Sequence, residues 1–255
     1  FLEESFIRPI RWIGCMLGDE HVSFSLFGVE STPFSYPHRT ISYEPFAYMF
    51  AGDYFERLSE RGVVLYPNIR KEIILTDFAV IEKKAGVNIE IDEELLNEVI
   101  AITESPKALI GSFEERFLRL PPEVIITSMK ENQRYFPVFK DGKLTNRFIV
   151  VSNAISDDYD LIVRGNEKVL RARLSDALFF LDNDLKRGLS YEGLKDITYL
   201  DGLGSLFDKE VRENAIALFL VSKYEAILLK AAPHLNVSTL KALMERSIML
   251  SKADL

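Results

Sequence analysis

The sequence predicts an α+β protein in which a mixed α/β domain is followed by an all-α domain. Up to about residue 155, short β-branched and aromatic runs alternate with segments of helical periodicity. Residues 135–151 carry the clearest hairpin pattern of the chain, and from Asp157 onward almost only helical periodicity is found. This change in pattern divides the chain into residues 1–155 and residues 156–255.

The first half of the α/β domain begins with a predicted hairpin. Residues 11–42 are rich in β-branched and aromatic residues, which predicts a hairpin with one solvent-facing side and turns at Gly18-Asp19 and Gly28. A helix over residues 44–61 and a short buried strand over residues 63–66 are expected next. The following predicted helix starts at Pro67, runs through Ala85 and stops at Gly86.

In the second half of this domain, predicted strands and helices again alternate. Residues 87–91 predict a strand, after which Asp92 caps a helix that ends before Pro106. Residues 109–111 predict a strand, residues 113–118 a turn or two of helix, and Pro121-Pro122 the start of a helix to about Asn132. In the hairpin that follows, Asp141-Gly142 is the turn, because glycine accepts a positive φ.

The helical domain opens with a long amphipathic segment. Apolar residues from Val169 to Leu181 recur at spacings of three and four, and Asn166 is a candidate cap for the helix start. Arg164, Lys168 and Arg171 form a basic strip beside that face, which is either a contact for phosphates or a solvated flank. Further helices are expected over residues 208–231 and 238–251.

Composition and charge limit the classes of function that the chain can have. The chain has 255 residues, 47% hydrophobic and 27% charged, and no apolar run approaches the ~20 residues of a membrane helix. No export signal opens the sequence, so we expect a soluble, cytoplasmic protein without membrane contact. The single cysteine, Cys15, excludes an internal disulfide and a cysteine-type zinc site. A net charge of −8 restricts nucleic-acid contact to local patches such as residues 124–153, where five cations face two acids.

The sequence predicts neither catalytic residues nor a metal site. There is no G-x-S-x-G motif, no adjacent His-Asp pair, and the three histidines lie in unrelated contexts. The glycines near Ser205 lack the third glycine of a phosphate loop, and Ser205 with Asp208 is better explained as a capping box. His38-Arg39 is either a polar pair in a groove or a structural pair, with the structural role favoured.

The predicted junction of a helix and a strand over residues 123–139 is a further candidate binding site. Lys130, Gln133 and Arg134 stand beside Tyr135, Phe136 and Phe139, a combination that suits phosphate binding and base stacking. The alternative is that the aromatic residues alternate into the core while the polar residues are solvated. Sequence pattern leaves both interpretations open.

Several long blocks carry a family resemblance. They read L-P-P-E-V-I-I-T-S-M-K-E-N-Q-R-Y-F-P-V-F (120–139), R-F-I-V-V-S-N (147–153), G-N-E-K-V-L-R-A-R-L-S-D-A-L-F-F (165–180), L-G-S-L-F-D-K (203–209) and S-K-A-D-L (251–255). In this order and at this spacing they closely resemble the beta subunit of the bacterial heterotetrameric glycyl-tRNA synthetase. R-P-I-R-W-I (8–13), P-H-R-T (37–40) and L-L-N-E-V (95–99) extend the resemblance over essentially the whole chain, as an N-terminal to middle fragment. Pro37 stands where the family usually has glycine before the His-Arg pair.

The resemblance implies a fold, partners and a function. Residues 1–155 would form a domain similar to the B3/B4 module of the phenylalanyl-tRNA synthetase beta subunit, and residues 156–255 the truncated start of an HD-like helical domain. An alpha subunit, in an alpha2beta2 assembly, would carry the class II catalytic core with glycine, ATP and Mg²⁺, so no cofactor is expected in this chain. The chain itself would bind and position glycine tRNA.

The expected tRNA contacts are the cations that cluster in an otherwise acidic chain: Lys130, Arg134, Arg164, Lys168, Arg171 and Arg173. Arg173 projects roughly opposite Arg164 on an ideal helix, so at least one cation is expected either to pair with an acid such as Asp176 or to link the two domains. Two alternatives remain open: a module that docks the alpha subunit without touching RNA, and a residual nucleotide or editing pocket in the first domain.

Overall fold

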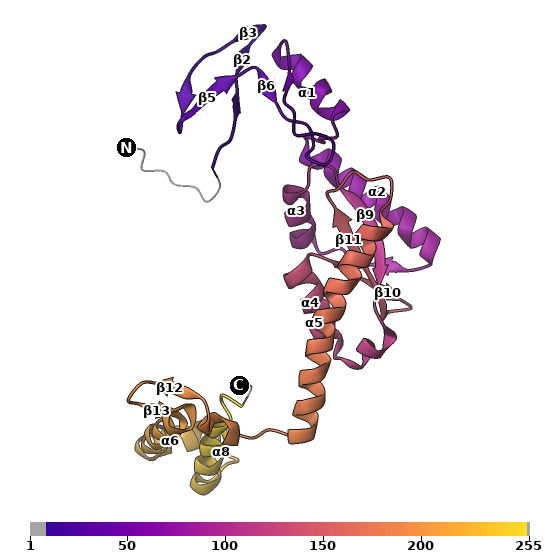
Figure 1. Cartoon of the computed structure of the whole chain (residues 1–255). Coiled ribbons are helices and arrows are strands. Elements are labelled where there is room, and N and C mark those ends of the chain that lie inside the picture. The colour runs from indigo at the N-terminus through magenta and orange to yellow at the C-terminus, as the bar shows by residue number, and fades with distance from the viewer. Residues whose placement is uncertain (1–8, 254–255) are drawn as a thin grey trace. The chain divides into compact units, whose positions relative to one another are not determined.

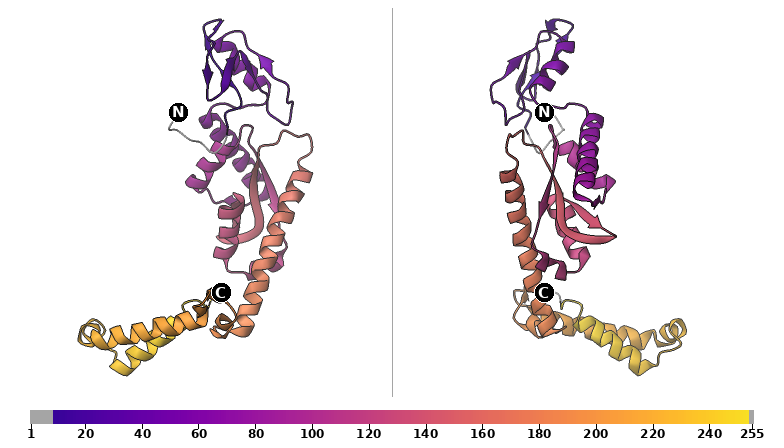
Figure 2. Two further views of the ribbon diagram at one scale, coloured as in Figure 1. Left: turned by 60° about the vertical axis from the view of Figure 1, so that its left-hand side comes forward. Right: turned by 90° about the vertical axis from the view of Figure 1, so that its right-hand side faces the viewer.

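The computed structural model describes residues 9–253, which form two compact units that divide between Leu178 and Phe179 (Figures 1 and 2). Helices and small sheets together confirm the predicted α+β class. The units divide within helix α5 (Asp160–Arg187), whereas the boundary between residues 155 and 156 stays a prediction from sequence pattern. No helix of the described part is long and apolar enough to cross a membrane.

The first unit is built on a four-stranded antiparallel sheet with the order β8-β10-β11-β9. Its strands are β8 (Asn88–Ile89), β9 (Lys107–Ser112), β10 (Phe136–Lys140) and β11 (Lys143–Ser152). The predicted hairpin is confirmed: β10 and β11 pair around Asp141 and Gly142, whose φ angles are 51° and 74°. The paired strands place successive side chains on opposite faces of the sheet, so each face has its own core.

Helices α2 (Pro67–Ala85) and α3 (Glu93–Ile102) cover one face of the sheet (Figure 2). Phe78 of α2 meets Phe136 of β10 edge to face, with ring centroids 5.1 Å apart. The ends of both helices follow the sequence: Pro67 occupies the first turn of α2, Gly86 ends it with φ 63°, and Asp92 caps α3. These predicted boundaries are confirmed.

The first half of α5 covers the opposite face (Figure 2). Its Leu170 and Leu174 are fully buried, and the Tyr135 and Phe148 rings stack 4.7 Å apart. Gly111 of β9 makes room for this layer, because a Cβ there would come within 2.5 Å of the Phe148 ring. The 3-10 helix η1 (Glu115–Arg119) and helix α4 (Pro122–Gln133) complete this part, as predicted for residues 113–132.

The N-terminal part of this unit consists of short strands and one helix. They are β1 (Ile13–Gly14), β2 (Met16–Leu17), β3 (Glu20–His21), β4 (Ser25–Leu26), β5 (Val29–Thr32), β6 (Phe34–Ser35), β7 (Phe46–Ala47) and α1 (Ala51–Glu60). The turns at Gly18 and Gly28 are confirmed by φ angles of 64° and 77°. The prediction of one hairpin was too simple, because two hairpins and a parallel pairing of β1 with β5 share the segment.

Two predictions in this region were wrong. The helix expected from residue 44 starts at Ala51, because Phe46 and Ala47 pair with β6 instead. The strand expected over residues 63–66 does not form. There the guanidinium of Arg70 binds the carbonyls of Val64 and Leu65 at 2.7 and 2.8 Å, which occupies groups that a neighbouring strand would need.

The second unit is mainly helical. After η2 (Glu192–Lys195) and the small pair β12 (Thr198–Leu200) and β13 (Gly204–Ser205) come α6 (Leu206–Lys223), α7 (Glu225–Ala231) and α8 (Val237–Met249). The single helix expected over residues 208–231 is therefore divided, with the division at Tyr224. The capping box of Ser205 and Asp208 is confirmed by reciprocal hydrogen bonds. Glu210 of α6 is fully buried and accepts a hydrogen bond from Ser251 at 3.0 Å.

Candidate nucleic-acid interface

Helix α5 presents most of the predicted phosphate contacts. The helix begins at Asp160, so the expectation that Asn166 caps its start was wrong. Asn166 lies inside the helix, where its Nδ2 donates to the Ile162 carbonyl at 2.7 Å and its Oδ1 accepts from the Tyr135 hydroxyl at 2.6 Å. The sequence signal failed because asparagine can bond within a helix as well as at its start.

The basic strip, defined as Arg164, Lys168 and Arg171, lies on an exposed flank of α5. Arg171 pairs with Glu114 at 2.8 Å. Among the described residues, Arg164 and Lys168 form no ion pair. They are one helical turn apart, about 6 Å along the axis. The strip therefore offers two uncommitted cations on a helix that is anchored to the sheet.

The anchoring of α5 fixes the direction of this strip. The buried Leu170 and Leu174 hold one face, and Glu167 accepts hydrogen bonds from the Ser112 backbone and hydroxyl at 2.8 and 3.0 Å. Asn166 adds the bond to Tyr135. Because the backbone of this helix is already ordered, binding of a ligand by its side chains costs little backbone entropy.

Arg173 lies on a different side of α5 from the strip. It follows Asn166 by seven residues, about two turns, and therefore projects on the side that faces Tyr135. Burial raises the pKa of Tyr135 to about 12, and the charge of Arg173 opposes that rise. Arg173 is exposed, but it cannot share one phosphate track with Arg164.

The two cations at the end of α4 are already paired. Lys130 Nζ lies 2.6 Å from Glu90 and 3.3 Å from Asp92, and Arg134 Nε lies 2.5 Å from Glu98. Burial lowers the pKa of Lys130, but its bonds to Glu90 and Asp92 have the larger combined effect in the opposite direction. The pKa is therefore raised above the usual lysine value, and the lysine is charged. Any phosphate at these positions would compete with three carboxylates.

The aromatic residues beside these cations are part of the core. Tyr135 is 2% exposed and Phe136 is fully buried, so the interpretation in which they stack on bases was wrong. Tyr135 directly precedes β10 and Phe136 is its first residue, so their side chains alternate into the packed layers on opposite faces of the sheet. Gln133, the last residue of α4, is half-buried, and its groove role stays a prediction.

His38 is fully buried, as the structural interpretation of the His38-Arg39 pair expects. Its backbone N–H donates to the Arg61 carbonyl at 3.0 Å, and its Nδ1 lies 2.8 Å from the Thr40 hydroxyl. Arg39 is exposed, and a groove contact by it stays a prediction.

One cation near α5 was not among the predicted tRNA contacts. Arg147 of β11 lines a groove of about 780 Å³ between β9, α2 and α5, together with Lys84 and Asp160. The only available signal was the positive balance of residues 124–153. Within residues 9–253, no group of three or more His, Cys, Asp or Glu side chains is arranged to hold a metal ion.

Comparison with known proteins identifies the family that this chain resembles. The family model described as "Glycyl-tRNA synthetase beta subunit" matches residues 2–255. The chain is 43% identical to a glycine–tRNA ligase beta subunit of Helicobacter pylori strain G27 over 265 residues, covering 100% of this chain and 37% of that protein. Subunits of the same description in Desulforamulus reducens and Bacillus subtilis strain 168 are each 40% identical, over 100% and 98% of this chain and 36% of either relative. The chain thus spans little more than a third of the length of these relatives.

Proposed function

Because the chain belongs to the family of glycyl-tRNA synthetase beta subunits, we propose that it is the tRNA-recognition part of such a subunit. In this role it holds glycine tRNA for ATP-dependent aminoacylation by a separate alpha subunit. Orientation of a bound substrate by itself lowers a reaction barrier, so a part without catalytic groups still contributes to the rate.

The proposal includes an architecture and a set of partners. Residues 1–155 correspond to a B3/B4-like domain and residues 156–255 to the beginning of an HD-like domain. The alpha subunit supplies a class II active site with ATP and Mg²⁺ in a cytoplasmic alpha2beta2 enzyme, and this chain holds no complete active site. What supports this division of roles between the two subunits is the family membership.

The observation that carries the proposal is the pair of uncommitted cations on α5. Arg164 and Lys168 are exposed and, within the described chain, have no acidic partner. Arg173 is a third exposed cation on another side of the helix. Lys130, Arg134 and Arg171 remain in the proposed interface, but each must exchange a carboxylate for a phosphate, so their net contribution is smaller.

The test is the affinity for glycine tRNA of the complete two-subunit enzyme carrying Arg164→Ala and Lys168→Ala. Loss of a phosphate contact reduces the salt dependence of log K by about 0.7–0.9 per cation, so the double variant is expected to lose roughly 1.5 units of slope. Lys83→Ala is the matched control, because Lys83 is an exposed lysine on α2, at the opposite face of the sheet. Unchanged affinity and slope in the double variant would remove the support for RNA contact by this strip.

An assembly module is the second candidate function. Phe179 and Phe180 are 64% and 62% exposed in the second unit, and adjacent exposed aromatic rings favour a protein partner. Pull-down of the alpha subunit in the absence of tRNA separates the two functions. Association that is strong, insensitive to salt and lost in Phe179→Ser/Phe180→Ser would favour assembly.

A further inference from the structure

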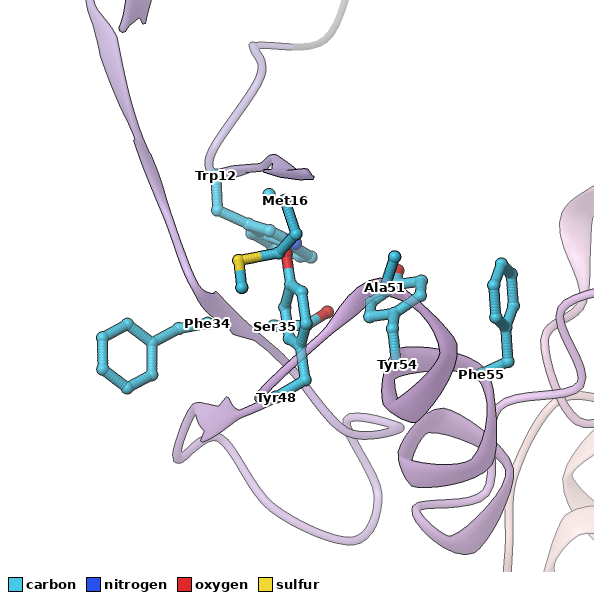
Figure 3. A pocket seen from close by; sticks show the side chains of 9 residues that line it. Trp12, Met16, Phe34, Ser35, Tyr48, Ala51, Tyr54 and Phe55 are labelled. Carbon is cyan, nitrogen blue, oxygen red and sulfur yellow. The ribbon is translucent and has the colours of Figure 1, made fainter. Parts of the chain in front are cut away.

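A small pocket in the N-terminal part of the first unit is separate from the cations discussed above. It encloses about 260 Å³ between the first strands, β6 and the start of α1. Figure 3 shows the side chains that surround it, among them Trp12, Met16, Tyr48 and Tyr54. The lining contains no charged side chain. The pocket therefore suits an uncharged group rather than a phosphate.

The walls of the pocket are aromatic rings held by one another. Tyr48 and Tyr54 meet edge to face with centroids 5.0 Å apart, and Trp12 packs on Tyr36 at 4.5 Å. Gly14 lets Tyr48 approach β1, because a Cβ at Gly14 would overlap the Tyr48 hydroxyl. Trp12 is nevertheless 44% exposed. A large ring that is fixed but open to solvent is available to stack on a ligand.

Hydroxyl groups complete the chemistry. Tyr48 and Ser35 are each 5% exposed, and both line the pocket. Neither hydroxyl bonds another group of the described chain, and neither oxygen is sealed from solvent. Both hydroxyls are therefore free to exchange water for the polar edge of a ligand. Each hydroxyl both donates and accepts, which fits the mixed edge of a nucleobase.

The size of the hollow limits the ligand. Pockets for small molecules span about 300–1,000 Å³, so 260 Å³ holds one ring system and leaves a sugar and phosphate outside. We infer that this pocket takes a single unpaired nucleobase of the bound tRNA, stacked between aromatic walls with Tyr48 and Ser35 at its polar edge. The inference rests on the proposed function, since tRNA is the source of the base.

Two substitutions test the pocket in the complete two-subunit enzyme. Ala51→Leu fills the hollow from the exposed first residue of α1 without removing a wall, and Tyr48→Phe removes one hydroxyl while keeping its ring. Ala79→Leu is the control, because Ala79 is an exposed helical alanine outside both pockets. Thermal unfolding of each variant shows whether it is folded.

Stacking of one base typically changes affinity by about 5- to 150-fold, so Ala51→Leu is expected to weaken tRNA binding within this range while Ala79→Leu does not. The salt slope is expected to stay constant, because no phosphate contact is lost. One unpaired base, protected from dimethyl sulfate in the native complex, should become reactive with Ala51→Leu. Tyr48→Phe should weaken binding less than the filled pocket does.

The inference and the proposed function fail in different ways. A normal affinity and an unchanged footprint with Ala51→Leu, alongside a reduced slope with the α5 variants, would overturn the base pocket alone. Loss of alpha-subunit association with Ala51→Leu, at unchanged tRNA protection, would assign the pocket to an aromatic side chain of a protein and also overturn it. Unchanged slope, affinity and footprint in all variants would overturn both.

Discussion

Replacing Tyr135 by Phe removes one buried hydroxyl and leaves the packing of the ring almost unchanged. The ring stacks on Phe148 with centroids 4.7 Å apart, and the hydroxyl donates to Asn166 of α5 at 2.6 Å. Tyr135 is 2% exposed, so the bond lies in the layer between the sheet and α5. The substitution therefore tests how firmly the helix that carries the basic strip is attached.

The expected loss follows from the partner that is left behind. In Tyr135→Phe, the Oδ1 of the half-buried Asn166 loses its donor, which costs about 1–3 kcal/mol of unfolding free energy. Tyr43→Phe is the control, because Tyr43 is 80% exposed. It should change the stability by less than about 0.5 kcal/mol.

The pH dependence of this difference has a definite sign. Burial raises the pKa of Tyr135 from 10.0 to about 12, so the folded state disfavours the phenolate. The stabilisation is complete below pH 10 and is lost as the pH rises toward 12. At pH 11 the native protein loses about 1.4 kcal/mol through this group, whereas Tyr135→Phe loses nothing there. The stability gap between them should narrow by that amount between pH 8 and pH 11.

Urea unfolding followed by circular dichroism, at pH 8 and pH 11, measures this gap. Equal stability of the native protein and Tyr135→Phe at pH 8 would show that the bond to Asn166 contributes nothing. A gap of the same size at both pH values would show that the pKa of Tyr135 is not raised. Either result would refute the reasoning about this layer.

Other substitutions address individual contacts. Gly111→Ala is expected to destabilise by about 1–3 kcal/mol through contact with the Phe148 ring, whereas Gly165→Ala, which meets nothing within 4 Å on α5, should stabilise by about 0.5–1 kcal/mol; thermal unfolding of the pair distinguishes the two environments. Ser205→Ala should destabilise α6 by about 1 kcal/mol through loss of the cap, measured as a lower Tm. Bonds from the Ser205 backbone and hydroxyl lower the pKa of Asp208, so the stabilisation by this carboxylate should disappear as the pH falls through its folded pKa, and Asp208→Asn should lack this acid-dependent step.

Local signals in the sequence were sufficient for most helix ends and turns. Pro67, Gly86, Asp92 and the Asp141-Gly142 turn stand where the structure uses them, because each acts through its own backbone or nearest neighbours. The capping box at Ser205 is of the same kind. The strand predicted over residues 63–66 failed because of a side-chain contact that periodicity does not contain: the guanidinium of Arg70, only five and six residues away, binds the carbonyls of Leu65 and Val64.

Sequence periodicity predicted the position of the basic strip but not the ion pairs of its residues. Periodicity placed Arg164, Lys168 and Arg171 on one flank of a helix whose other face is buried, and the structure agrees. Whether each cation forms an ion pair depends on acidic residues that are distant from it in the sequence. Glu114 pairs with Arg171, and Glu90 and Asp92 pair with Lys130, although these acids lie more than 35 residues from their partners.

The sequence by itself determined the α+β class, the positions of the caps and turns, and the family, because these depend on local chemistry and on the order of residues along the chain. Only the tertiary structure decided which charged and aromatic side chains are available. It buried Tyr135 and Phe136 in the sheet, paired Lys130 and Arg134 with acids, and left Arg164 and Lys168 without acidic partners in the described chain. It also gathered Trp12, Tyr48 and Ser35 into one pocket, since ion pairing and burial depend on contacts between elements that sequence periodicity does not contain.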